Sequence, residues 1–260
     1  MTGHRKPMTS QEMRMRPAGQ RTRNEKRETS HFSNLAVGVA MLIAIATAAP
    51  AAAQDRSVAP GINERFLEGR NYEEFVGSFE REGREIFDRR QEILKAVGLK
   101  PGMAAADIGA GSGLFTYLFA QEVGPGGKVY AVDINQVMLE NIVRRSRELG
   151  YKHVEGRLGS AKGVPVPPGS LDVAFTSDVY HHFEFPQVML RSIRDALKPG
   201  GAFIVIDFER IPGVSSPRTL EHVRAGKEVV IKEVEAEGFR FVEERKLLQQ
   251  NYFVRFEKVR

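Results

Sequence analysis

Two short apolar runs, each ending in an acidic residue, constrain the fold of this 260-residue chain more than any other feature. Residues 106–113 read Ala-Asp-Ile-Gly-Ala-Gly-Ser-Gly, and residues 129–133, Val-Tyr-Ala-Val-Asp, follow one helix length later. The first run predicts a buried strand that opens into a glycine turn, where missing Cβ atoms let a ligand approach the backbone. The helix expected over residues 114–122 presents unpaired N–H groups to that ligand. Asp133 is placed to accept hydrogen bonds from two ribose hydroxyls, which favours a cofactor that carries a nucleoside.

The spacing of the glycines separates the possible nucleoside cofactors. A dinucleotide-binding turn has the form G-x-G-x-x-G or A, whereas Gly109, Gly111 and Gly113 give G-x-G-x-G. Leu114 occupies the sixth position. Asp107, on the strand before the turn, would repel a pyrophosphate but suits a cationic amino-acid group. S-adenosylmethionine carries an ammonium group, a sulfonium and no phosphate, so the charge pattern favours it over NAD. An NAD(P)-linked oxidoreductase is the alternative.

Four segments, in order, resemble class I S-adenosylmethionine-dependent methyltransferases. Residues 107–113 resemble motif I of that family, and Asp133 matches the acid that ends its second strand. Residues 171–177 resemble its fourth strand, and residues 197–207 resemble the helix end, turn and fifth strand. The resemblance covers roughly residues 85–260 and is greatest to the type 11 small-molecule group, which includes quinone-biosynthesis methyltransferases. It implies methyl transfer from S-adenosylmethionine to a small-molecule or lipid-like acceptor.

The resemblance also implies where the cofactor lies. An acidic residue often follows the third strand in the family and contacts the adenine amino group, but Ser160 occupies that position here. A hydroxyl accepts more weakly than a carboxylate, so a domain of this fold that has lost catalysis and serves in binding or regulation is a rival hypothesis. Asp107 is expected to meet the ammonium group or to accept an N–H of the turn, and Asp133 could instead cap the next helix. The predicted cofactor-binding residues are Asp107, Gly109, Ala110, Gly111, Ser112, Gly113, Asp133, Ile134, Ser160, Ala161 and Ser177.

The candidates for catalysis follow the fourth expected strand, at the sheet edge where ligands bind. Methyl transfer needs mainly alignment and a dry pocket, and a base is needed only where the acceptor must lose a proton. His181 or His182 could be that base, although either could instead pack against the cofactor or the next helix. No metal site is predicted, because adjacent histidines are expected to point apart and no third ligand is evident. The candidate catalytic residues are Asp178, Tyr180, His181 and His182.

Two further segments are expected to enclose the acceptor. The family resemblance implies that residues 211–224, which include His222, roof the acceptor pocket. Tyr72, Phe75 and Phe79 are candidates for the opposite wall, and core packing explains these aromatic residues equally well.

The net charge of +5 comes from the N-terminal segment. Residues 1–34 hold eight of the 38 Lys and Arg residues but only three of the 33 acidic ones, which leaves residues 35–260 balanced. A balanced domain has no basic footprint for a phosphate backbone, so nucleic acid is not an expected partner. The chain has no cysteine, which excludes thiolate metal sites and thiol nucleophiles.

Residues 35–49 form an uncharged apolar stretch that is short for a membrane span of roughly twenty residues. Basic residues precede it, and the three alanines at 51–53 before Gln54 have the pattern of a cleavage site. Residues 1–53 are therefore interpreted as a basic leader with a secretory signal peptide, which predicts an exported, periplasmic protein; translation could begin at Met13 or Met15. The alternatives are an uncleaved anchor, which would be the chain's membrane contact, and a disordered cytosolic tail.

The rest of the pattern predicts an α/β fold in two parts. Residues 54–98 are expected to form a polar linker and one or two helices that act as a lid. Residues 99–260 are expected to form the S-adenosylmethionine-binding methyltransferase domain. Strands alternate with helices and end in a hairpin over residues 239–259. This order implies a Rossmann-like, doubly wound, seven-stranded sheet with one antiparallel strand.

Overall fold

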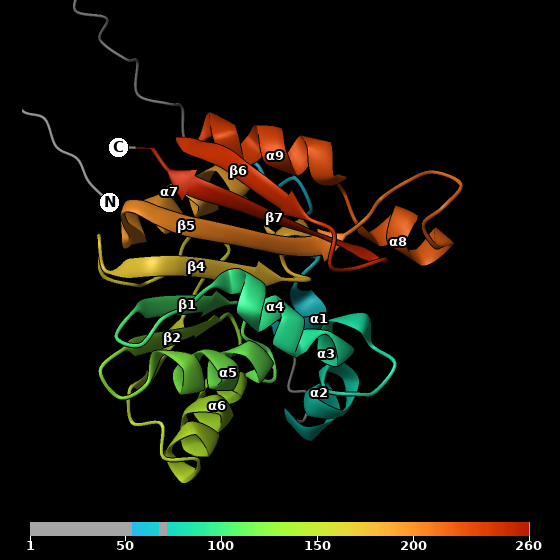
Figure 1. Cartoon of the computed structure of the whole chain (residues 1–260). Helices are drawn as coiled ribbons and strands as arrows, with labels where there is room; N and C mark the ends of the chain where they lie inside the picture. The colour runs from blue at the N-terminus through green and yellow to red at the C-terminus, as the bar shows by residue number, and fades with distance from the viewer. Residues whose placement is uncertain (1–53, 68–71, 260) are drawn as a thin grey trace, which may run out of the picture. The chain divides into compact units, whose positions relative to one another are not determined.

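The centre of the protein is one seven-stranded sheet with the strand order β3-β2-β1-β4-β5-β7-β6 (Figure 1). The structure, a computed structural model, describes residues 54–67 and 72–259, so the predicted leader over residues 1–53 lies outside the described residues. None of the helices within these ranges has the length and hydropathy that crossing a membrane requires. The strands are β1 (Ala104–Ile108), β2 (Lys128–Asp133), β3 (Val154–Leu158), β4 (Leu171–Ser177), β5 (Leu197–Phe208), β6 (Phe239–Arg245) and β7 (Asn251–Lys258).

The predicted arrangement of strands is confirmed. Strands β1 to β5 pair in parallel, whereas β7 runs antiparallel to both of its neighbours, β5 and β6. Only β7 is reversed, because the β6–β7 hairpin returns it alongside β5. The strand order also changes direction between β1 and β4, and ligands of doubly wound sheets bind at this point.

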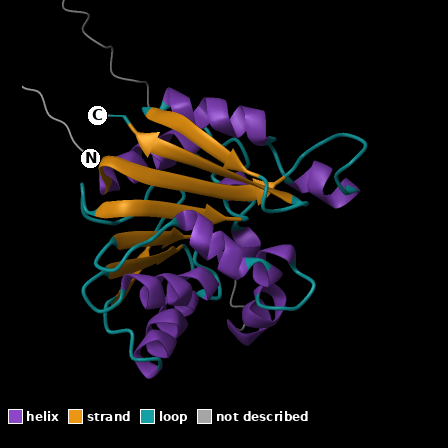
Figure 2. Cartoon of the chain, viewed as in Figure 1, coloured by secondary structure: helices purple, strands orange, loops and turns teal. Residues whose placement is uncertain are grey.

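Helices cover both faces of the sheet (Figure 2). Successive side chains of β2 point to opposite faces of the sheet, so they contribute to different helix-covered layers. Tyr130 and Val132 belong to the apolar cluster that includes residues of α7 and α9. Val129 belongs to the cluster that includes α4 and α5, and Ala131 belongs to the cluster that includes α6. The helices are α1 (Glu64–Leu67), α2 (Tyr72–Phe79), α3 (Glu85–Asp88), α4 (Arg90–Val97), α5 (Leu114–Val123), α6 (Gln136–Glu148), the 3₁₀ helix η1 (Tyr180–His182), α7 (Pro186–Ala196), α8 (Pro217–His222) and α9 (Lys227–Ala236).

The N-terminal part of the domain differs from the prediction of one or two helices, because four short helical segments, α1 to α4, precede β1 within residues 54–67 and 72–103. The chain leaves helical geometry at Gly83, which has φ +82°, and at the extended residue Arg84. The Asp88 carboxylate accepts a hydrogen bond from Gly83 N at 3.1 Å and stabilises this break. The irregular spacing of apolar residues in this segment therefore indicates a real break between helices.

The predicted polar linker is bound to the domain over its described residues. Val58 N donates to Glu184 O at 2.9 Å, and Asn63 Nδ2 donates to His182 O at 3.0 Å. The Gln54 side-chain oxygen accepts from Gln187 N at 3.1 Å. This segment therefore supports the loop that joins β4 to α7.

Two other differences concern the second half of the sheet. Strand β5 begins at Leu197 rather than at residue 202, because Leu197 pairs with Leu171 of β4, and the predicted turn forms the irregularity between that pair and the pair Val173–Ala202. Helix α8 was not predicted, although Ser216 and Pro217 are a typical start signal. The Ser216 hydroxyl accepts from Thr219 N at 3.1 Å.

Candidate active site

A cavity of about 530 Å³ opens at the carboxyl ends of β1, β2, β4 and β5. Asp107, Asp133 and Ser177 line it from three of these strands, and Phe208 lines it from the fourth. Its volume lies in the range of small-molecule sites. The cavity therefore occupies the position at which a doubly wound sheet binds its ligand.

The glycine turn forms one wall of the cavity, and two of its positions require glycine. Gly109 has φ +74°, and a Cβ atom there would lie 2.5 Å from a methyl carbon of Val179. Gly113 has φ +84° and is the residue before α5; a Cβ atom there would lie 2.7 Å from the ring of Tyr117. Gly113 does not line the cavity, whereas Gly111 does. Gly113 thus shapes the turn without facing the ligand space.

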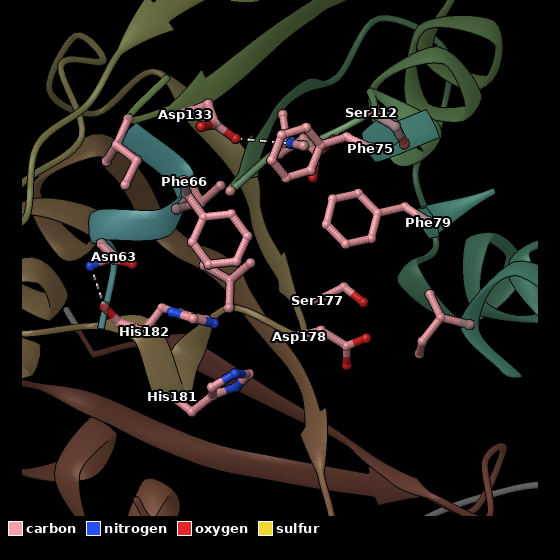
Figure 3. Close-up of a pocket in the computed structure, with 18 of the residues that line it drawn as sticks. Asn63, Phe66, Phe75, Phe79, Ser112, Asp133, Ser177, Asp178, His181 and His182 are labelled. Atoms are coloured by element: carbon pink, nitrogen blue, oxygen red, sulfur yellow. Dashed lines mark hydrogen bonds between the residues drawn. The ribbon is translucent and has the colours of Figure 1, made fainter. Parts of the chain in front are cut away.

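The Asp133 carboxylate joins two loops at the cavity wall. Its Oδ2 accepts a hydrogen bond from Gly111 N at 2.9 Å, drawn as a dashed line in Figure 3, and its Oδ1 accepts from Asn135 N at 2.9 Å. Burial raises the pKa of Asp133, against the effect of these backbone donors. The cap of α6 is Asn135, whose side chain accepts from Val137 N and Met138 N. The alternative that Asp133 caps this helix is therefore wrong, and the carboxylate keeps acceptor capacity for a ligand hydroxyl.

Asp107 is a nearly inaccessible carboxyl group, 4% exposed, that lines the cavity. Its Oδ2 accepts from Thr116 Oγ1 of α5 at 2.7 Å. Burial raises the pKa of Asp107 to about 7, while the hydrogen bond from Thr116 acts in the opposite direction. A cationic ligand group would favour the ionised form of this carboxyl.

The other predicted cofactor residues lie along the same cavity. Ser177 Oγ is buried and has no hydrogen-bond partner among the described residues. Such an atom at a cavity wall is typical of a site whose ligand supplies the partner. Ser160 Oγ accepts from Lys162 N at 3.2 Å, so its hydroxyl stabilises its own loop. Of the predicted set, all members except Gly113 line the cavity, namely Asp107, Gly109, Ala110, Gly111, Ser112, Asp133, Ile134, Ser160, Ala161 and Ser177.

The two adjacent histidines do not point apart as expected. Their ring centroids are 4.2 Å apart, and both rings line the cavity (Figure 3). His222 of α8 lies against both, with its ring centroid 4.9 Å from that of His181 and 5.2 Å from that of His182. Burial, together with the charges of the two neighbouring histidines, lowers the pKa of His182 to about 2. His182 is therefore neutral at physiological pH and a weak proton acceptor.

Asp207, which the sequence reasoning missed, fixes the orientation of His181. His181 Nδ1 lies 2.8 Å from Asp207 Oδ1, and His181 N donates to Oδ2 at 2.9 Å. These side chains are 3% and 1% exposed. A carboxylate accepts hydrogen bonds, so Nδ1 of His181 is the donor in this contact and Nε2 is the ring nitrogen left for another partner.

The other two catalytic candidates have structural partners. Tyr180 is fully buried outside the cavity, and its hydroxyl donates to Glu233 Oε2 at 2.9 Å. The prediction that Tyr180 orients a substrate is therefore wrong. Asp178 does line the cavity, but its Oδ2 pairs with Arg84 at 2.6 Å and its Oδ1 accepts from Asn251 Nδ2 at 2.6 Å. Its carboxylate thus connects the N-terminal helices to the loop after β4.

We expect Arg84→Ala to lower the free energy of unfolding by about 1–3 kcal/mol, because it leaves the Asp178 carboxylate buried without its ionic partner. Arg89→Ala is the matched control, since the Arg89–Glu92 pair has side chains 48% and 52% exposed. An exposed pair contributes about 0–1 kcal/mol. Urea unfolding of the three proteins measures the difference, and equal losses in the two variants would contradict this role for Arg84.

Aromatic side chains form the wall opposite the sheet. Phe75 and Phe79 line the cavity as predicted, and Phe66 of α1 joins them (Figure 3). Tyr72 does not line the cavity, so its predicted place in this wall is wrong. Its hydroxyl donates to Ser112 O at 2.7 Å and braces the glycine turn.

The fold and this site together define a class of protein: the Rossmann-like methyltransferases that use S-adenosylmethionine. The profile of the methyltransferase-domain family matches residues 99–251, more than half of the chain, and the chain belongs to that family.

Individual relatives agree with this membership. The chain is 37% identical over 124 residues to the ubiquinone/menaquinone biosynthesis C-methyltransferase UbiE of Ectopseudomonas mendocina, covering 46% of this chain and 47% of the relative. It is 30% identical over 118 residues to the demethylmenaquinone methyltransferase of Lactococcus lactis, and the match covers 45% of this chain and 47% of that relative. The chain spans about a third to a half of the length of the curated relatives that it matches. It is also similar to the crystal structure of a SAM-dependent methyltransferase from Aquifex aeolicus, with a TM-score of 0.65, 26% identity, and coverage of 74% of this chain and 100% of that one.

The residues present fit S-adenosylmethionine. Gly109 and Gly111 line the cavity with backbone, the space of their missing Cβ atoms being taken by Val179 and Phe79, and Asp133 keeps acceptor capacity for a ribose. The carboxyl of Asp107 suits an ammonium group, and the unpaired hydroxyl of Ser177 can meet a polar group of the ligand. The acid that the family carries at the adenine end is absent, because Ser160 occupies its position. The Ser160 hydroxyl accepts a hydrogen bond from Lys162 N within its own loop.

Proposed function

We propose that this protein transfers a methyl group from S-adenosylmethionine to a small, largely apolar acceptor. A single observation carries the proposal: one continuous cavity is lined both by the carboxylates of Asp107 and Asp133 and by the histidine and aromatic side chains. The carboxylate half suits the cofactor's amino-acid and ribose groups. The other half suits an apolar acceptor, so donor and acceptor would meet within one cavity.

The chain's own residues would hold the two reactants in line. When bound, S-adenosylmethionine supplies a methyl carbon activated by its sulfonium. Asp133 would orient the ribose and Asp107 the ammonium group, while Phe66, Phe75 and Phe79 exclude water from the reacting atoms. The methyl–sulfur bond breaks as the bond to the acceptor forms. With a hydroxyl acceptor, the O–H bond also breaks and its proton passes to solvent. Alignment of this kind lowers a barrier by several kcal/mol, up to about 7–11.

The walls of the acceptor half favour a flat or lipid-like molecule. Phe66 contacts the ring of His182 edge-on, with centroids 5.1 Å apart, and Phe75 and Phe79 are 5.6 Å apart. Offset and edge-on contacts of this type suit an aromatic guest. The names of the relatives refer to quinone biosynthesis, and we propose a hydroxylated aromatic or quinol-like acceptor here as well.

Labelled methyl transfer tests the function. The purified chain is incubated with S-adenosylmethionine carrying a deuterated methyl group and a lipid extract, and products are identified by mass spectrometry. We expect a labelled apolar product together with S-adenosylhomocysteine, and much less of both with the Asp133→Asn variant at a cofactor concentration near the Kd of the unaltered chain. Binding of the cofactor without any transfer to extract or to model quinols would instead support the catalytically inactive alternative.

We expect the affinity for S-adenosylmethionine to rise with pH up to about pH 7. The free protein holds Asp107 with its pKa raised to about 7 by burial, and the bound ammonium group would lower that pKa, so binding below pH 7 releases a proton. The affinity should be about tenfold higher at pH 8 than at pH 6. Calorimetric titration in two buffers of different ionisation enthalpy measures both affinity and proton release. Asp107→Asn should bind more weakly and without this pH dependence; an unchanged dependence in that variant would exclude Asp107 as its source.

We further propose that the chain is exported and cleaved after Ala53. The apolar run over residues 35–49 and the alanines that follow support the proposal. So does the side chain of Gln54, which would be the first residue of the mature chain and already contacts Gln187 N at 3.1 Å. The intact mass of the protein isolated from the periplasm measures the start; a cytosolic chain that retains the leader would exclude export.

A further inference from the structure

Three histidines from two distant segments meet in the acceptor half of the cavity. His181 and His182 belong to η1, and His222 ends α8. Each offers one ring nitrogen, and these three atoms all lie within 4.8 Å of one another. Three imidazoles at this separation form a set of ligand atoms for one metal ion, since a tetrahedral ion with bonds of about 2.0–2.1 Å spaces its ligands about 3.3 Å apart. Small rotations of the rings would close the remaining distance.

The surroundings of His181 match those of a metal-binding histidine. The Asp207 carboxylate is held by three donors: His181 Nδ1 at 2.8 Å, His181 N at 2.9 Å and Phe208 N at 2.8 Å. A histidine whose Nδ1–H is bound by a fixed carboxylate presents Nε2 as a basic ligand, and metal-binding histidines almost always have such a partner. Asn63 Nδ2 additionally donates to His182 O at 3.0 Å and holds the backbone of η1 (Figure 3).

His182 supplies an independent sign of a missing ligand. Its Nδ1 is buried and has no hydrogen-bond partner within the described part of the chain. A buried polar atom without a partner costs about 1–3 kcal/mol, and its retention requires an explanation. A cation bound to this nitrogen, or a water molecule coordinated to that cation, would remove the cost.

We propose that His181, His182 and His222 bind one divalent transition-metal ion of the zinc type. Neutral imidazole suits zinc, iron, copper and nickel, whereas magnesium and calcium prefer oxygen ligands. Three protein ligands leave a further coordination position open toward the cavity, as in catalytic zinc sites. The positive charges of Arg65 and Arg218 act on His222, and the carboxylate of Asp207 opposes them to a smaller extent. The affinity should therefore be moderate.

The role of the ion rests on the proposed function, whereas its binding does not. At this position it would act as a Lewis acid on an acceptor hydroxyl and lower the pKa of that group. His181 would then be a metal ligand rather than the lone base that the sequence suggested.

Zinc binding by the full chain, produced without a polyhistidine tag, tests the proposal. Titration against a chromophoric chelator should give one site per chain, and His222→Ala should weaken it by about 30-fold or more. Asp207→Asn should weaken it by about 10- to 100-fold, through loss of the fixed ring orientation. His153→Gln is the matched control, because His153 lies outside the cavity and binds Ala120 O at 2.8 Å. It should leave the affinity unchanged.

Cobalt(II) provides a second readout, since a tetrahedral histidine site gives a strong visible absorption that His222→Ala should abolish. Lack of zinc binding, or zinc binding that His222→Ala leaves unchanged, would overturn the proposal. Calorimetry with S-adenosylmethionine on the same samples keeps the two hypotheses separate. Cofactor binding without zinc binding removes the metal site alone, and zinc binding without cofactor binding removes the methyltransferase function alone.

Discussion

Replacing Gly109 by alanine is expected to lower the free energy of unfolding by about 2–5 kcal/mol. Two costs combine at this position. The residue has φ +74°, where an L-residue loses about 1–2 kcal/mol. The new Cβ would also lie 2.5 and 2.6 Å from the two methyl carbons of Val179, and overpacking of this kind costs about 1–3 kcal/mol. Urea unfolding followed by circular dichroism measures the loss.

Two further variants separate the two costs. Gly150→Ala is the control for the backbone alone, because Gly150 has φ +84° and no described atom within 4 Å of an added Cβ. It should lose only about 1–2 kcal/mol. Adding Val179→Ala to Gly109→Ala should recover much of the steric part, because it removes both methyl carbons and leaves only the Val179 Cβ at 3.0 Å; a double-mutant cycle measures the recovery as a coupling energy of about 1–3 kcal/mol. A Gly109→Ala variant no less stable than Gly150→Ala would show that the turn can move away from Val179.

Replacing Asp133 by asparagine is expected to weaken S-adenosylmethionine binding by at least about 30-fold. A hydrogen bond to a charged group contributes about 1.5–3 kcal/mol, and a factor of ten corresponds to about 1.4 kcal/mol. The amide also places an NH₂ group against one of the two backbone donors, Gly111 N or Asn135 N, so the wall of the ribose site loses its geometry. Calorimetric titration with S-adenosylmethionine and S-adenosylhomocysteine measures both affinities.

Asp195→Asn is the matched control for this charge change. Asp195 lies in the last turn of α7 with its side chain 66% exposed, and it does not line the cavity. Its affinity for the cofactor should equal that of the unaltered chain. If Asp133→Asn bound with the same Kd as Asp195→Asn, the ribose could not lie against Asp133.

The cofactor half of the site could be predicted because its signals are local. Asp107 and Asp133 each end an apolar strand, and the glycines lie next to one of them in the sequence. Parallel strands bring their carboxyl ends to one edge, so the residues that follow them must meet. The same rule applied to β5 would have found Asp207, which lies one residue before the end of an apolar strand and contacts His181. That signal was present in the sequence and was overlooked.

The acceptor half could not be predicted in the same way, because long-range packing creates it. No local pattern relates His222 to His181, because they are 41 residues apart in the sequence. Their ring contact depends on where α8 packs. The role of Tyr180 was misjudged for a related reason. It lies between two cavity-facing neighbours in the sequence, yet the tight η1 turn directs its hydroxyl to Glu233 in α9.

The sequence alone determined that the sheet is doubly wound with one antiparallel strand, and it determined which carboxylates face the cofactor site. Strand alternation, glycine spacing and acidic strand ends each act over a few residues, so they remain visible without the fold. Only the tertiary structure decided which side chains share the acceptor half, that Arg84 pairs with Asp178, and that three histidines converge. These contacts join residues far apart in the chain, and their geometry arises from the packing of whole helices and loops rather than from any local preference.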